Sequence, residues 1–216
     1  MRRAALSMLV VLAAGIAVLI LLGSQRDRDV AFSLGVVPSA PIGLKPGAEL
    51  CQGVVSAVDD FEAVRLQVGT FKRTGSSFRL ALRAPDGTRL ADRRVSGGYA
   101  DNARLTVPVG AIGEGTRFEL CVTDTGRRAI APYGGAALAS RSTEATLNGR
   151  PLPQDMSADF MRAKPASLLS LAPEMAERAS LFHGKWVGAW TIWLLAFCVL
   201  AVVPALLLLA LRASQP

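Results

Sequence analysis

The chain has 216 residues, of which 51% are hydrophobic and 19% are charged. Its 24 Lys and Arg residues outnumber its 17 Asp and Glu residues, and the formal net charge is +7. The basic residues form no continuous block and are not interleaved with aromatic residues, so the composition does not indicate nucleic-acid binding. The single histidine, His183, excludes Ser-His-Asp and Cys-His catalysis from any domain that lacks it.

The first predicted element is an apolar segment at the N-terminus. Residues 4–23 carry no charge, and a helix of this length spans about 30 Å, the thickness of a bilayer's hydrocarbon core. We therefore expect an uncleaved transmembrane anchor over residues 1–24. A cleaved signal peptide is the alternative, because Arg2 and Arg3 precede the apolar run. The run is longer than a typical signal core and lacks an evident cleavage site, which favours the anchor.

Residues 25–48 are expected to be a linker, and residues 49–150 a β-sandwich domain. Apolar and polar residues alternate with a period of two, which is typical of half-buried strands. The apolar sets are Val64, Leu66 and Val68; Phe78, Leu80 and Leu82; Leu105, Val107 and Val109; and Phe118, Leu120 and Val122. Turn sequences such as Ala-Pro-Asp-Gly at 84–87 separate the runs. About seven or eight short strands of this kind predict an all-β sandwich with a jelly-roll-like arrangement.

Two copies of Glu-Leu-Cys end at Cys51 and Cys121. Their flanking residues differ, which argues against an internal repeat. No Cys-x-x-Cys is present and residues 49–148 contain no histidine, so we predict neither a metal site nor a catalytic thiol. A disulfide between the two cysteines is the prediction, and two buried free thiols are the alternative. Because each cysteine follows an inward-facing leucine, the bridge should lie on the outer face of the sandwich.

The predicted disulfide also decides the expected location of the sandwich. Persistent disulfides form in oxidising compartments, whereas the charges that flank the apolar segments favour neither orientation. We therefore expect the sandwich to be extracytoplasmic and both termini to be cytoplasmic.

The candidate ligand-binding residues are the two tyrosines of the chain and their polar neighbours: Tyr99, Asp101, Asn102 and Tyr133. Glycan sites use aromatic faces for stacking and polar groups that orient the ligand. The alternative is that both tyrosines merely cover the ends of the sandwich. Asp59 and Asp60 could in principle serve glycoside hydrolysis, but adjacent aspartates are more typical of solvated turns. No catalytic residue and no cofactor are predicted.

Residues 151–185 are expected to be a partly helical connector, followed by a second transmembrane helix at residues 186–212. Within the connector, apolar residues recur at helical intervals at Leu168, Leu171, Met175, Ala179 and Phe182. This helix would lie on the membrane surface or pack on the sandwich, and the pattern does not separate the two. The second span begins with three tryptophans that favour the membrane interface: Trp186, Trp190 and Trp193. Residues 213–216 would form a cytoplasmic tail.

Three segments carry a resemblance to known proteins: CQGVVSAVDDFEAVRLQVGTFKR from Cys51, FELCVTDTGRRAIAPYGG from Phe118 and GKWVGAWTIWLL from Gly184. They resemble membrane-anchored β-sandwich segments of uncharacterised envelope proteins of GC-rich bacteria, some of which accompany large membrane glycosyltransferases. The resemblance covers most of residues 36–195 and implies a cell-envelope glycan context. It transfers no functional residue.

The sequence therefore predicts a non-enzymatic, two-pass protein of the plasma membrane with an accessory or scaffolding role in cell-envelope glycan assembly or export. Its expected partners are the lipid bilayer, a membrane protein such as a glycosyltransferase, and a glycan. A glycan- or ligand-binding module is the second hypothesis and would show a concave aromatic groove at Tyr99 and Tyr133. An enzyme acting on envelope glycans is the third, and it would require a clustered pair of carboxylates with perturbed pKa values.

Overall fold

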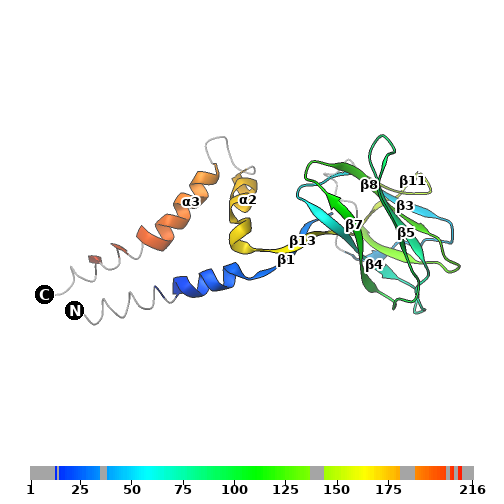
Figure 1. Ribbon diagram of the computed structural model, residues 1–216, viewed down its shortest axis with the longest axis horizontal. Coiled ribbons are helices and arrows are strands. Elements are labelled where there is room, and N and C mark those ends of the chain that lie inside the picture. Colours follow the sequence, from blue (N-terminus) through cyan, green and yellow to red (C-terminus); the bar gives the residue numbers. More distant parts are fainter. Residues whose placement is uncertain are drawn as a thin grey trace. The chain divides into compact units, whose positions relative to one another are not determined.

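The computed structural model describes residues 13, 15–34, 38–136, 144–180, 188–202, 205–206 and 209–210 (Figure 1). The chain divides into two compact units. One unit comprises residues 29–165, and the other comprises residues 1–28 together with residues 166–216.

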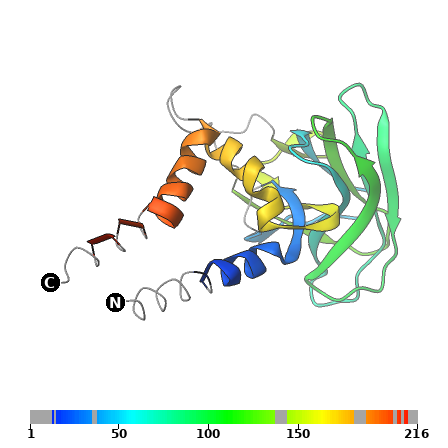
Figure 2. The same ribbon diagram turned by 60° about the vertical axis from the view of Figure 1, so that its left-hand side comes forward.

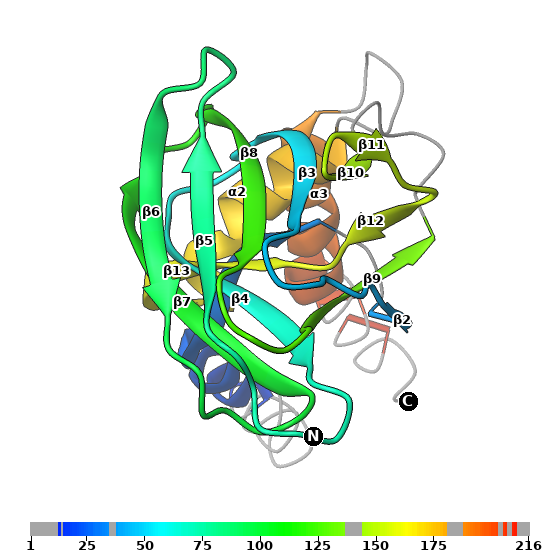
Figure 3. The same cartoon turned by 90° about the vertical axis from the view of Figure 1, so that its right-hand side faces the viewer.

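The unit of residues 29–165 is built from two β-sheets (Figure 3). The seven-stranded sheet contains β1 (Arg26–Ser33), β13 (Asp159–Ser167), β4 (Phe61–Gly69), β9 (Ala131–Ala136) and β12 (Gln154–Met156), with β2 (Ala40–Pro41) paired to β9 and β7 (Ala103–Ile112) paired to β4. The six-stranded sheet has the order β11 (Arg150–Pro151), β10 (Ala145–Leu147), β3 (Glu49–Ser56), β8 (Arg117–Asp124), β5 (Phe78–Arg83) and β6 (Arg89–Val95). The predicted all-β sandwich is confirmed, and its jelly-roll-like strand order stays a prediction.

One hydrophobic core fills the space between the sheets, and it follows the alternation of the sequence. The predicted apolar residues of β4, β5 and β8 are all buried, and so are Val107 and Val109 of β7. Leu105 is half-buried and packs against the same core. The turn at residues 84–87 joins β5 to β6, and the Gly87 N–H donates to the Ala84 carbonyl at 2.9 Å. The period-two pattern thus identified both the strands and their inward faces.

Four phenylalanines gather at the end of the sandwich where β4 and β8 begin. Phe61 and Phe118 are the first or second residues of these strands, and their ring centroids lie 5.5 Å apart. Phe160 of β13 lies 4.9 Å from Phe61 and stacks on Phe32 of β1 at 4.3 Å. Aromatic pairs at these separations add to the stability that burial provides. We call this group the phenylalanine cluster.

The cysteines form the predicted disulfide. Cys51 of β3 and Cys121 of β8 lie directly opposite each other in the antiparallel pair and are bonded. Both are buried, and they group with Ala81 of β5 apart from the core between the sheets. The bridge therefore ties two neighbouring strands on the outer face of the six-stranded sheet, as their position after the inward-facing leucines predicted.

The sandwich extends beyond the predicted residues 49–150 on both sides. The segment expected to be a linker, residues 25–48, contributes β1 and β2, and residues 151–185 contribute β12 and β13. β1 reads RDRDVAFS and β13 reads DFMRAKPAS, so charged residues interrupt the alternation in both. The two strands neighbour each other, and β1 ends the path of strands in its sheet. A strand at such a place tolerates charges that the interior of a sheet excludes.

The second unit contains helices (Figure 2). Residues 15–24 are helical, and α2 (Leu168–Ser180), α3 (Ala189–Phe197) and the π-helical η1 (Cys198–Val202) follow the sandwich in the chain. The helix predicted inside the connector is thus confirmed as α2. It begins beside Ser167, whose hydroxyl accepts the Ser170 N–H at 3.1 Å, a typical N-terminal cap.

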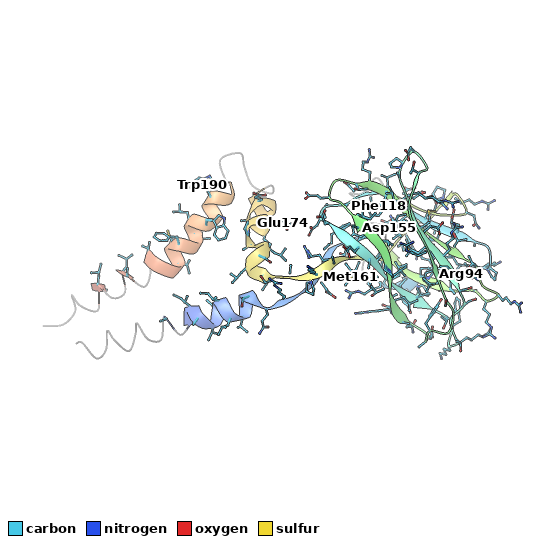
Figure 4. All side chains as sticks on the ribbon, in the orientation of Figure 1. Arg94, Phe118, Asp155, Met161, Glu174 and Trp190 are labelled. Atoms are coloured by element: carbon cyan, nitrogen blue, oxygen red, sulfur yellow. A yellow bond between two sulfur atoms is a disulfide. The ribbon has the colours of Figure 1, made fainter. Side chains whose placement is uncertain are left out.

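Among the residues that the structure describes, no helix is both long and apolar enough to cross a membrane. The predicted spans, residues 1–24 and 186–212, lie partly outside these residues, and both spans stay predictions. Trp190 and Trp193 are exposed on α3, and Figure 4 labels Trp190. Trp186 lies outside the described residues.

Candidate functional site

Three loops meet at the end of the sandwich opposite the phenylalanine cluster. They are the β4–β5 loop (residues 70–77), the β6–β7 loop (residues 96–102) and the β8–β9 loop (residues 125–130). Phe78, which opens β5, pairs with Val95 at the end of β6 and with Asp124 at the end of β8. Strand register therefore brings the three loops to one place.

The β4–β5 and β6–β7 loops are joined through Gly75 and Tyr99. The Gly75 N–H donates to the Tyr99 carbonyl at 2.8 Å, and the Gly98 N–H donates to the Gly75 carbonyl at 2.9 Å. A Cβ atom on Gly75 would lie 2.2 Å from the Tyr99 ring. The ring therefore lies directly against a backbone position that only glycine can occupy without a shift.

Tyr99 supports the loops with both ends of its side chain. Its ring contacts Phe78 edge-on at 6.1 Å, and its hydroxyl donates to the Ser76 carbonyl at 2.8 Å. Burial, together with the charge of Asp124, raises the pKa of Tyr99 to about 12. The hydroxyl therefore stays protonated, and remains a donor, at any physiological pH.

Ser76 joins the β4–β5 loop to the β8–β9 loop. Its hydroxyl oxygen accepts the backbone N–H groups of Arg127 at 3.1 Å and Arg128 at 3.4 Å. A Cβ atom on Gly126 would lie 1.7 Å from the same oxygen, so this contact also requires glycine. The hydrogen bonds fix the backbone from which the two arginine side chains project.

Asp101 holds the opposite part of the β4–β5 loop. Its carboxylate accepts the Thr70 N–H at 2.5 Å and the Lys72 N–H at 2.9 Å. These backbone hydrogen bonds, the one from Thr70 first, lower the pKa of Asp101. Phe71 and Lys72 have left-handed φ values of 56° and 60°, a conformation that is unfavourable for bulky residues. Asp101 thus stabilises a strained loop.

An open cleft lies among these loops and consists of two adjoining lobes. The first lobe has a volume of about 700 Å³, and the charged residues that line it are Lys72, Arg73, Asp101 and Arg128. The second has a volume of about 430 Å³, and its charged residues are Arg94, Arg127 and Arg128. Thr74 and Arg128 line both lobes, so the two lobes adjoin at these residues.

The cleft is strongly basic. The five residues Lys72, Arg73, Arg94, Arg127 and Arg128 are exposed. None of these five forms an ion pair with any residue in the described part of the chain. The one acid in the lining, Asp101, uses its carboxylate on loop backbone.

The four predicted ligand-binding residues separate into two pairs. Tyr99 and Asp101 line the first lobe. Tyr133 donates its hydroxyl proton to the Asn102 side-chain oxygen at 2.8 Å, and neither residue lines a lobe. The two tyrosines therefore do not form the expected aromatic groove, because Tyr99 contacts Ser76 and Phe78 whereas Tyr133 contacts Asn102.

Sequence reasoning missed the basic residues of the cleft. The positions of these residues relative to the strands could have identified them. Lys72-Arg73 and Arg127-Arg128 follow the ends of β4 and β8, and Arg94 lies at the end of β6. The strands β4, β6 and β8 all end at this end of the sandwich, although they belong to two sheets, so basic residues near their ends come together.

Asp59 and Asp60, which were weighed for glycoside hydrolysis, have structural partners. Asp59 pairs with Arg162, and Asp60 accepts the Glu114 N–H at 2.8 Å.

Asp124 is buried at the base of the β8–β9 loop, and desolvation raises its pKa. One of its oxygens accepts the Gly126 N–H at 2.9 Å, so the carboxyl shapes the loop.

Glu49, Cys51 and Cys121 bring potential ligand atoms within 4.8 Å of one another. Both sulfurs belong to the disulfide, and the Glu49 carboxylate accepts a hydrogen bond from Arg83 at 2.5 Å. Metal binding by cysteine requires a free thiolate, which these sulfurs cannot supply while bonded.

No protein-family model and no curated protein matches the chain. Among solved structures, the chain is similar to CsCBM6-3 from Clostridium stercorarium in complex with cellobiose, with a TM-score of 0.33 and 17% identity over 50% of this chain and 88% of that one. It is also similar to a family two carbohydrate esterase from Cellvibrio japonicus, with a TM-score of 0.33 and 7% identity over 67% of this chain. A third similarity, to the VP2 subviral particle of infectious bursal disease virus, has a TM-score of 0.31 and 11% identity over 66% of this chain.

The chain spans 33% of the length of the esterase and 39% of the length of the viral protein. At these scores the similarities bear neither on the ligand nor on the activity of this protein. The chemistry of the cleft rests on its own residues.

Proposed function

We propose that this protein is an extracytoplasmic binding module that holds a negatively charged glycan in its basic cleft. One observation carries the proposal: five basic side chains without ion-pair partners in the described residues line an open cleft. Charge-assisted hydrogen bonds from Arg and Lys to anionic oxygens are stronger than those between neutral groups.

The form of the cleft favours a glycan chain over a compact cofactor. Both lobes are open to solvent, so a polymer can enter and leave at either side. Hydroxyl groups of Thr74, Ser77 and Thr125 stand beside the basic residues and can exchange hydrogen bonds with sugar hydroxyls. The disulfide supports a location where nucleic acids are absent and acidic glycans are present.

The accessory role in envelope glycan assembly is part of the same proposal. The uncharged segments at residues 4–23 and 186–211 support attachment to a bilayer, and a membrane glycosyltransferase is the proposed partner. A binding role, in place of an enzymatic one, is supported by the lack of histidine in residues 49–148 and by the structural use of Asp59, Asp60 and Asp101.

Calorimetric titration of the full chain in detergent micelles tests the proposal. The probes are hexagalacturonate and the same hexasaccharide with every carboxyl methyl-esterified, which removes the charge and keeps the sugar chain. We expect only the acidic form to bind, with an affinity that falls as salt is added. Equal binding of the two forms would overturn the proposal.

A pair of variants checks that binding occurs in the cleft. The double substitution Arg127→Gln and Arg128→Gln should weaken the binding of hexagalacturonate at least about tenfold, since each lost charged contact of about 1.4 kcal/mol or more has that effect. Arg117→Gln is the matched control, because Arg117 is exposed at the opposite end of the sandwich. A loss of affinity that is equal in the control would place binding elsewhere.

A further inference from the structure

We infer that the cleft recognises a linear chain with at least two negative charges, one held in each lobe. The inference rests on the proposed function and specifies its ligand class: a polyanionic glycan, as opposed to a neutral glycan with one acidic group.

The distribution of the basic residues is the first argument. Lys72 and Arg73 line only the first lobe, and Arg94 and Arg127 line only the second. Arg128 lines both, at the junction. Each lobe therefore has two basic side chains of its own, and the charge continues without a gap from one lobe to the next.

The size of the lobes is the second argument. At about 700 Å³ and about 430 Å³, each lobe alone is within the range of complete small-molecule sites, about 300–1,000 Å³. A single sugar unit fills part of one lobe and leaves the charges of the other without a partner. Only a chain that crosses the junction at Arg128 engages both.

The independent support of the two lobes is the third argument. The backbone of Lys72 is held by the Asp101 carboxylate, whereas the backbone of Arg127 is held by the Ser76 hydroxyl. Two separately fixed sets of charges present a spaced pattern to the ligand before it binds. A ligand with matching spacing gains from both sets, because binding at one lobe raises the effective concentration at the other.

Repeating carboxylates and repeating phosphodiesters share the chemistry that the cleft requires. A guanidinium group presents parallel N–H donors that match the paired oxygens of either anion. The test therefore uses two series of probes. One consists of tetragalacturonate and a tetrasaccharide of the same length with one free carboxyl and three methyl esters. The other consists of a glycerol-phosphate tetramer joined by phosphodiesters and glycerophosphoglycerol, a single phosphodiester that carries one negative charge.

Affinities are measured by calorimetry on the full chain in detergent micelles. We expect the fully charged member of the preferred series to bind at least about tenfold more tightly than its singly charged counterpart, the effect of one added contact of about 1.4 kcal/mol. The series in which the added charges raise the affinity more shows whether the cleft prefers carboxylates or phosphodiesters. Gains below about threefold in both series would overturn the inference.

Two double variants test whether each lobe contributes to the higher affinity for the fully charged probe. Lys72→Gln with Arg73→Gln empties the first lobe of its own charges, and Arg94→Gln with Arg127→Gln does the same for the second. Each should reduce the affinity for the fully charged probe to nearly that for the singly charged one, and Arg117→Gln should preserve the difference. Unfolding temperatures should be unchanged, because the substituted side chains are exposed and form no ion pair among the described residues.

The outcomes separate the inference from the proposed function. If one double variant abolishes all binding and the other has no effect, a single lobe suffices and the inference fails, whereas the proposed function stands. If no charged probe binds at all, the proposed function is wrong, and the inference that rests on it is wrong as well.

Discussion

The two ends of the sandwich use arginine in opposite ways. Where β4 begins, Arg162 pairs with Asp59, and Arg65 of the same sheet pairs with Asp159 at 3.0 Å and with Asp29 at 3.4 Å. Where β4 ends, the basic residues of the cleft have no acidic partner within the described residues. The chain therefore neutralises arginines where strands must pack and leaves them available where loops face solvent.

The two ends also differ in what holds them together. The phenylalanine cluster closes one end by burial of aromatic surface. The loops at the other end keep their shape through backbone and side-chain hydrogen bonds centred on Ser76 and Asp101. The aromatic cluster thus lies at one end and the proposed binding site at the other, so substitutions at the two ends should separate stability from binding.

The largest difference in stability between the two ends is expected for substitutions of phenylalanine. Phe160→Ala should lower the free energy of unfolding by about 3–5 kcal/mol, because it leaves a cavity within the cluster. Phe71→Ala, at an exposed position in the β4–β5 loop, should change it by no more than about 0.5 kcal/mol. Urea unfolding followed by circular dichroism measures both. Similar losses would show that the loop end contributes as much to stability as the cluster.

The disulfide lies between the two ends, because Cys121 is three residues from Phe118 and three from Asp124 in β8. Replacement of both cysteines by alanine should lower the free energy of unfolding by about 2–4 kcal/mol, since the bridge restricts a long loop in the unfolded chain. The affinity of the cleft should be preserved while the variant is folded. Maleimide labelling of unreduced, denatured wild type provides the control, and ready labelling at Cys51 or Cys121 would contradict the bridge.

Arginine substitutions compare the ends directly. Arg162→Gln should cost about 2 kcal/mol of stability, because the guanidinium group donates to both Asp59 and the Val30 carbonyl in a mostly buried position. Arg128→Gln should leave stability within about 0.5 kcal/mol of wild type and reduce only binding. Thermal unfolding and probe titration of the two variants give the comparison. A stability loss at Arg128 would mean that it has a structural partner.

A smaller loss of stability than at Phe160, the disulfide or Arg162 is expected at Tyr99. Tyr99→Phe should lower the free energy of unfolding at pH 7 by about 1 kcal/mol, because the ring keeps its contact with Phe78 and loses the hydrogen bond to Ser76. The pKa of Tyr99 is raised from its ordinary value of 10.0 to about 12 in the folded protein. The unfolded chain ionises first, so wild type should lose this contribution as the pH rises from about 10 to about 12.

Unfolding curves recorded across that pH range measure this effect. The variant has no hydroxyl at residue 99, so its stability should fall less steeply than that of wild type. Parallel pH profiles would contradict the raised pKa of Tyr99.

The sequence was sufficient for the sandwich core and the disulfide. Alternation in β4 placed Val64, Leu66 and Val68 inward because each strand buries one face, a property of the local pattern. The same rule placed Cys51 and Cys121 outside the core, and they pair across neighbouring strands. Strands β1 and β13 were missed because charged residues interrupt the alternation in both sequences.

The cleft could be predicted only in part. Tyr99 and Asp101 were selected as loop residues with suitable chemistry, and they do line the first lobe. The basic residues come from positions 72 to 128 and meet only through the pairing of β5 with β6 and β8. The basic residues form no continuous block in the sequence, and only strand register shows where they gather. Asn102 and Tyr133 had suitable chemistry but bind each other.

Both segments that lead out of the sandwich depart at the end away from the cleft. β13 runs antiparallel to β4, so the chain moves away from the cleft end as it passes from Asp159 to Met161. Leu34 of the β1 segment donates to the Ala158 carbonyl, and Arg162 donates to the Val30 carbonyl, so β1 enters from that same end. Tension between a held ligand and the rest of the chain would run along the strands. The three residue pairs that join β13 to β4, from Asp159 to Met161, would then bear the load together in shear.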